Sequence, residues 1–142
     1  MGRFLRIFIL FPLLVGCSSK DESTSHKYEY SDVKDKQISY LDVFNVNSDK
    51  YYLYYYQTNC YHCHGIKSKV ISYALSCSNP FYFVEVTEDY GFLSHSKEET
   101  IGTNDPMQAF SLMTPQLSLV IDGYIAETYI GEEEIMNIIE YS

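Results

Sequence analysis

Two cysteines separated by two residues are the part of this 142-residue chain best suited to chemistry. Cys60 and Cys63 enclose Tyr61 and His62, and His64 follows directly, so the local sequence reads Cys-Tyr-His-Cys-His. Such a pair can form a redox-active dithiol, a haem attachment site of the C-x-x-C-H type, or part of a metal site. Which of these three kinds of chemistry applies depends on the helices and strands that position the pair.

The hydrophobic pattern around the pair predicts an α/β arrangement of elements. Residues 51–57 are apolar or aromatic on both faces, which is typical of a central strand covered on both sides. Asn59 could cap the helix that follows, and Asp122-Gly123 is a tight-hairpin sequence. Strands are expected over residues 51–57, 81–86, 116–121 and 124–130. Helices are expected over residues 38–46, 60–76, 107–112 and 132–141.

The N-terminal residues have the form of a secretory signal. Arg3 and Arg6 precede an apolar run over residues 7–15, which is too short for a stable membrane span. The run ends in Leu-Val-Gly before Cys17, which resembles the bacterial lipobox. That resemblance implies a lipoprotein signal peptide over residues 1–16 and a diacylated Cys17 that anchors the chain to the membrane. An ordinary secretory signal with a chance cysteine is the alternative.

Composition separates the rest of the chain into a tether and one domain. Residues 17–36 are polar and charged with few aliphatic side chains, which predicts a disordered tether, and residues 37–142 would form the domain.

The chain carries ten Lys and Arg against nineteen Asp and Glu, a net charge of −9. Since phosphate binding needs clustered basic residues, this balance argues against a nucleic-acid partner. We expect a monomer.

Two separated signatures resemble those of the thioredoxin-like superfamily. One is the strand that leads into the C-x-x-C pair and a helix, and the other is Met113-Thr114-Pro115 leading into a hairpin and a terminal helix. The resemblance implies a thioredoxin-like α/β fold with a four-stranded mixed sheet flanked by helices. It also implies that Pro115 is cis and lies beside the dithiol, where Thr114, Pro115 and Tyr61 would bind substrate. Small extracytoplasmic proteins of this kind, including those labelled bacteriocin transport accessory proteins, are similar to this chain.

The resemblance and simple electrostatics give the residues of the pair separate roles. Cys60, at a helix N-terminus that stabilises its thiolate, would be the nucleophile, and the more buried Cys63 would resolve the mixed disulfide. His62 would help to stabilise the thiolate and favours an oxidase or isomerase. Asn59 stands where thioredoxins carry tryptophan and Tyr54 where they carry a buried acid, so thioredoxin-type reduction is not expected to be efficient. The direction of exchange and the substrates are left open.

The sequence therefore predicts a membrane-tethered, extracytoplasmic thiol-disulfide oxidoreductase that needs no cofactor or metal. Its partners would be protein thiols or disulfides and an extracytoplasmic or membrane redox partner. Three alternatives remain open. The first is a non-catalytic thioredoxin-like binding module, and the second is a c-type haem protein with His64 as axial ligand and Met107 or Met113 as sixth ligand. The third is a zinc or copper site at the pair, for which Cys77 is too distant to be a good fourth ligand.

Overall fold

The computed structural model describes residues 26–87 and 96–141 of the chain. The predicted signal peptide, the lipidation site Cys17 and residues 17–25 of the predicted tether lie outside the described residues, as does His95. Within the described ranges, no helix is long and apolar enough to span a membrane.

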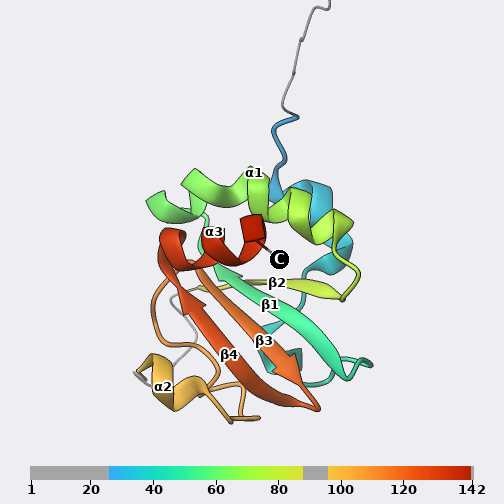
Figure 1. Ribbon diagram of the computed structural model, residues 1–142, viewed down its shortest axis with the longest axis vertical. Helices are drawn as coiled ribbons and strands as arrows, with labels where there is room; N and C mark the ends of the chain where they lie inside the picture. Colours follow the sequence, from blue (N-terminus) through green and yellow to red (C-terminus); the bar gives the residue numbers. More distant parts are fainter. Residues whose placement is uncertain (1–25, 88–95, 142) are drawn as a thin grey trace, which may run out of the picture.

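A four-stranded mixed sheet forms the centre of the molecule, as predicted (Figure 1). Its strands are β1 (Lys50–Tyr56), β2 (Phe81–Glu85), β3 (Gln116–Ile121) and β4 (Tyr124–Ile130), in the spatial order β2-β1-β3-β4. β1 pairs in parallel with β2 and antiparallel with β3, and β3 pairs antiparallel with β4. Asp122 and Gly123 make the predicted hairpin turn with φ values of 53° and 82°, a left-handed pair that matches the twist of the two strands.

The central position of β1 explains its aromatic sequence. Successive side chains of a strand point to opposite faces. Tyr54 and Tyr56 belong to the core on one face, and Tyr51, Leu53 and Tyr55 belong to the core on the other. All five are buried, so both faces of β1 are covered as the sequence predicted.

Two helices lie on one face of the sheet, α1 (Tyr61–Ser76) and α3 (Gly131–Tyr141). Ile66, Val70 and Ile71 of α1 and Ile135 of α3 enter the core with the aromatic side chains of β1 and β2. Both helices begin on the same side of the molecule, the left in Figure 1. The N-terminal turns of two helices therefore lie near one another, at the end of the sheet to which β1 leads.

The folded domain begins before residue 37, so the predicted boundary of the tether is wrong over its last part. Residues 30–36 form the 3₁₀ helix η1 (Tyr30–Lys36), in which Val33 is 0 % exposed. The Tyr30 ring stacks on Tyr56 with 3.7 Å between ring centroids. Glu29 pairs with the buried Lys67 of α1. One valine and spaced tyrosines are enough to anchor this segment, although its overall composition is polar.

The other face of the sheet is covered by short elements. The helix expected over residues 38–46 is only the turn η2 (Tyr40–Asp42), and the residue of this stretch that is fully buried is Val43. The Tyr51 hydroxyl donates to the Val43 carbonyl at 2.7 Å, which places this loop against β1. The prediction of a helix over residues 107–112 is wrong, because this stretch consists of turns and loop. A short helix, α2 (Lys97–Thr100), precedes it.

Candidate active site

A disulfide joins Cys60 to Cys63 where β1 ends and α1 begins. Cys60 is the N-cap of α1, and the backbone N–H of Cys63 donates to Cys60 Sγ at 3.1 Å. The first N–H groups of a helix have no partner within the helix, so an acceptor at the N-cap satisfies one of them. The sequence suggested Asn59 for this position, but the residue that caps the helix is the predicted nucleophile itself.

The two sulfurs differ in their access to solvent. Cys63 is 1 % exposed and lies in the core below the first turn of α1, whereas Cys60 is half-buried. Tyr61, between them, is 84 % exposed. Of the two cysteines, Cys60 is therefore the one nearer to solvent; which sulfur a substrate attacks stays a prediction.

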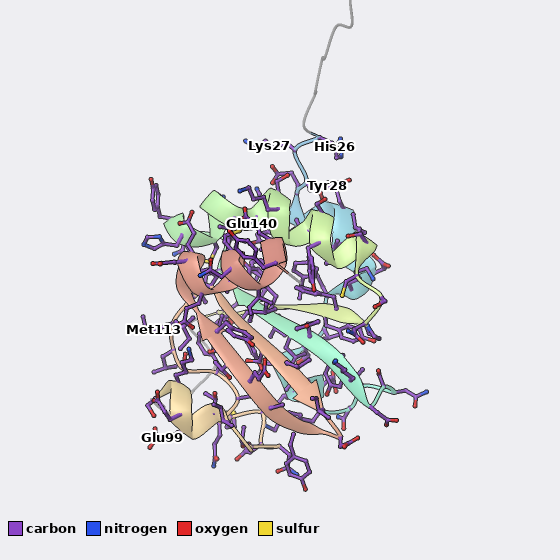
Figure 2. All side chains as sticks on the ribbon, in the orientation of Figure 1. His26, Lys27, Tyr28, Glu99, Met113 and Glu140 are labelled. Atoms are coloured by element: carbon purple, nitrogen blue, oxygen red, sulfur yellow. A yellow bond between two sulfur atoms is a disulfide. The ribbon has the colours of Figure 1, made fainter. Side chains whose placement is uncertain are left out.

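The loop before β3 lies against the disulfide. The Thr114–Pro115 peptide bond is cis, and the Thr114 carbonyl oxygen lies 3.5 Å from Cys60 Sγ. Because a disulfide sulfur carries no hydrogen, this is a contact in the oxidised protein, and only the reduced thiol could donate to the carbonyl. Met113, at 59 % exposure, projects at the edge of the molecule where α1 and α3 begin (Figure 2). The structure thus brings Thr114 to the pair as the resemblance implied; the role of Thr114, Pro115 and Tyr61 in substrate binding stays a prediction.

A buried glutamine holds this loop in place, and the sequence analysis missed it. Gln116 Oε1 accepts from the N–H and the hydroxyl of Ser111 at 2.9 and 2.8 Å. Its Nε2 group donates to the Ala109 carbonyl and the Ser118 hydroxyl at 2.8 and 3.0 Å. The signal available in the sequence was a polar residue at the start of an apolar strand. The four bonds fix both ends of the segment that contains Met113 and Thr114.

His62 faces the first turn of α3. Its Nδ1 atom lies 3.5 Å from a carboxylate oxygen of Glu132, and both side chains are partly exposed. The two residues, with Met113 and Thr114, line an open groove of about 810 Å³ beside the disulfide. His64 is directed elsewhere, since its Nε2 atom lies 2.7 Å from the Thr58 carbonyl oxygen. Of the two histidines beside the cysteines, His62 lines this groove and His64 does not.

Tyr54 occupies the position where the resemblance would place a buried acid. It is 0 % exposed, and its hydroxyl lies near that of Tyr30 without a regular hydrogen bond to any residue of the described ranges. Burial raises the pKa of Tyr54 well above its ordinary value. This position therefore stays uncharged near neutral pH and offers no carboxylate base beneath the dithiol.

The cysteines and histidines that the structure describes do not assemble a metal centre. Among residues 26–87 and 96–141, no three His, Cys, Asp or Glu side chains gather as metal ligands would. Cys77 is a half-buried free thiol at the C-terminal end of α1, the opposite end from Cys60. The haem interpretation expected a helical domain, and the sheet at the centre of this fold does not fit it.

Comparison with known proteins supports the fold. No protein-family model matches the chain, and no curated protein sequence matches it. Thioredoxin f2 of Chlamydomonas reinhardtii superposes with a TM-score of 0.53 at 13 % identity, over 74 % of this chain and 93 % of that one. Oxidised mitochondrial thioredoxin 3 of Saccharomyces cerevisiae gives 0.53 at 16 % identity, over 75 % and 94 %. The fold is thioredoxin-like. Within it, the Cys60–Cys63 pair is consistent with thiol-disulfide exchange.

Proposed function

We propose that the protein is a thiol-disulfide oxidoreductase that exchanges disulfides with other proteins through Cys60 and Cys63. The observation that carries the proposal is the asymmetry of the disulfide: Cys60 is half-buried at a helix N-cap with its Sγ atom beside the Thr114 carbonyl, whereas Cys63 is 1 % exposed. A structural disulfide gains nothing from such an arrangement. A catalytic one needs it, because attack must occur at one chosen sulfur.

Exchange with a substrate dithiol proceeds in two displacements. A substrate thiolate attacks Cys60 Sγ, a mixed disulfide forms, and Cys63 leaves as a thiolate. A second substrate thiolate then attacks the substrate sulfur of that bond and releases Cys60 as a thiolate. The substrate loses two electrons and becomes a disulfide, while the protein gains two electrons and becomes a dithiol. In the reverse direction, Cys60 thiolate attacks a substrate disulfide and Cys63 resolves the intermediate.

The helix N-terminus supplies the stabilisation that the leaving Cys60 thiolate requires. The Cys63 N–H is already directed at Cys60 Sγ, and the partial positive charge of the first turn of α1 acts on the same atom. A hydrogen bond to a charged acceptor is stronger than one to a neutral sulfur. The reduced state therefore gains more from this geometry than the disulfide does.

We further propose that the protein works outside the cytoplasm as a monomer tethered to the membrane through lipid on Cys17. The lipobox-like residues before Cys17 support the anchor, and two acyl chains on that residue would suffice for stable anchoring. Disulfides persist in such compartments, and an extracytoplasmic or membrane redox partner would regenerate the pair. Metabolic labelling with a fatty acid tests the anchor. Wild-type protein should take up label and Cys17→Ala should not; unlabelled wild-type protein free in the medium would contradict the tether.

Trapping of the intermediate tests the exchange activity. Cys63→Ala should accumulate mixed disulfides through Cys60, visible as adducts that a reductant dissolves, because the resolving thiol is gone. Cys60→Ala should form none. Cys77→Ala is the matched control and should behave as wild type, since that thiol lies at the far end of α1. If Cys63→Ala traps nothing while remaining folded, exchange is refuted and the non-catalytic binding module is favoured.

A further inference from the structure

One carboxylate of α3 lies against the first turns of α1. Glu132 Oε2 is 3.5 Å from His62 Nδ1. A Cβ atom placed on Gly65 would lie 3.3 Å from Glu132 Oε1, so the absence of a side chain at residue 65 leaves the room that Glu132 occupies. His62 and Gly65 are three residues apart and share one face of the helix. Glu132 is thus seated on the face of α1 that carries the histidine of the C-x-x-C pair.

The start of α3 is tied to the active-site loop. Gly131 has a φ of 84°, a conformation that favours glycine, and its N–H donates to the Pro115 carbonyl at 2.9 Å. Glu132 follows directly. The backbone therefore holds this carboxylate at a defined place relative to the dithiol, although its side chain is partly exposed.

We propose that Glu132 is a positioning residue that acts through His62 to make the Cys60–Cys63 couple more reducing than its C-x-H-C sequence implies. The inference rests on the proposed exchange function and concerns its direction. An imidazolium near the Cys60 thiolate stabilises the reduced form and so makes a couple more oxidising. The Glu132 carboxylate, 3.5 Å from His62 Nδ1, offsets positive charge on that ring and so lowers the stabilisation that the ring can give to a nearby thiolate. The disulfide carries no charge and is affected less.

Glu132 is the carboxylate of this groove that lies against His62, and two of the other groove carboxylates are paired with lysines. Of the other groups that line the groove, Glu134 pairs with Lys97 at 2.6 Å and Glu140 pairs with Lys69 at 3.1 Å. Glu133 lines the same groove but makes no ion pair within the described residues. It carries the same charge one position away and is the natural control.

The test is the reduction potential of the full chain, measured by equilibration with glutathione buffers. Glu132→Gln keeps the size of the side chain and removes the charge. It should shift the equilibrium about two- to fivefold toward the dithiol, the range expected for a partly exposed pair, which corresponds to a potential about 10 to 20 mV more positive. Glu133→Gln should shift it by less than half as much. Glu132→Asp retracts the carboxylate from His62 and should give a smaller shift of the same sign.

A double variant tests the route through His62. In the His62→Ala background, Glu132→Gln should move the potential by less than half of its effect in the wild type. Three results would overturn the inference: an unchanged potential in Glu132→Gln, an equal shift in Glu133→Gln, or a full shift without His62. If Cys63→Ala still traps adducts in that case, the exchange activity stands and only the role of Glu132 fails.

Discussion

Under the proposed function, single residues of this site serve structure and chemistry at once. Cys60 caps α1 with the same sulfur that a substrate thiolate would attack. The N–H that a serine or aspartate satisfies at other helix starts is here directed at the reactive atom. One side chain therefore caps the helix and would be stabilised there as a thiolate. The sequence suggested Asn59 as the cap and did not indicate this double role.

The contribution of His62 to the Cys60 thiolate is a residue-scale prediction. In the reduced protein, the thiol pKa of Cys60 should lie below the free-cysteine value of about 8.5. His62→Ala should raise it, because a neighbour that stabilises the thiolate is lost. The rate of iodoacetamide alkylation as a function of pH, with Cys77→Ala as background, measures it. A free-cysteine value in the wild type would contradict the assignment of Cys60 as the activated nucleophile.

The buried Tyr54 hydroxyl gives a second prediction at this scale. A buried donor without a partner costs about 1 to 3 kcal/mol, and no regular bond to Tyr54 Oη exists among the residues described. Tyr54→Phe removes the hydroxyl and keeps the ring that packs beside Tyr56 and Phe83. It should leave the free energy of unfolding unchanged or raise it by about 1 kcal/mol, as measured by urea denaturation, and exchange should persist. A loss of stability beyond about 1 kcal/mol would show that the hydroxyl has a partner.

At the scale of elements, one buried amide holds the active-site loop to the sheet. Gln116 is the first residue of β3 and makes four hydrogen bonds, all within the segment 109–118. Leu112, inside that segment, has a φ of 63°, a conformation that costs a non-glycine residue about 1 to 2 kcal/mol. Fully satisfied polar networks of this kind rigidify a structure, and here the network sets the place of Thr114.

Gln116→Leu should therefore weaken both stability and exchange. It preserves apolar packing but leaves the buried Ser111 N–H without its acceptor, and one such group costs about 1 to 3 kcal/mol. Urea denaturation should show a loss of at least this size. The rate constant for exchange with a peptide disulfide should fall by more than the rate of alkylation of reduced Cys60, because a small reagent touches only the sulfur, although the Thr114 carbonyl lies beside that sulfur. An equal fall in the exchange rate and in the alkylation rate would show that the substitution disturbs α1, which carries the cysteines, and not the loop alone.

The elements differ in how far sequence alone could predict them. All four strands and both long helices could be predicted from the sequence, because a continuous aromatic run such as that of Lys50–Tyr56, or apolar residues at helical spacing such as those of Tyr61–Ser76, form a consistent pattern. η1 escaped prediction because its anchors, Val33 and Tyr30, are embedded in charged residues. The His62–Glu132 approach was also unpredictable, since it joins residues 70 positions apart and depends on how α3 packs on α1.

At the scale of the whole molecule, ion pairs fasten peripheral segments to the core. Glu29 pairs with Lys67, and Glu134 pairs with Lys97 and accepts from the Ile130 N–H at 2.9 Å. The hydrogen bond from the lysine is the main cause that lowers the pKa of each carboxylate. A lowered pKa in the folded state means that the stabilisation is present above the unfolded pKa of about 4.3 and is lost as pH falls through the folded value. The melting temperature should thus decline below about pH 4.5, and less steeply in Lys67→Met, which lacks the Glu29 pair; an equal slope in that variant would contradict the contribution of this pair.

The tyrosine-rich core determines the highest pH at which the folded protein is stable. The chain has 15 tyrosines and no tryptophan, and burial is the main cause that raises the pKa of Tyr51, Tyr52, Tyr56 and Tyr129 to about 12. In the unfolded chain these phenols ionise near pH 10. Because the folded state holds the protons more tightly, their stabilisation is complete below about pH 10 and is lost as pH rises toward 12.

We therefore expect the oxidised protein, in which Cys60 and Cys63 do not titrate, to unfold cooperatively between about pH 10 and 12. Tyrosinate absorbance should show a steep rise that coincides with the loss of circular dichroism, because the buried phenols ionise only as the protein unfolds. Tyr51→Phe removes one raised group together with its bond to the Val43 carbonyl. Unfolding of that variant should depend less steeply on pH in this window, even though its stability at neutral pH is lower. A smooth titration of all phenols near pH 10, without a structural transition, would contradict the burial of these tyrosines.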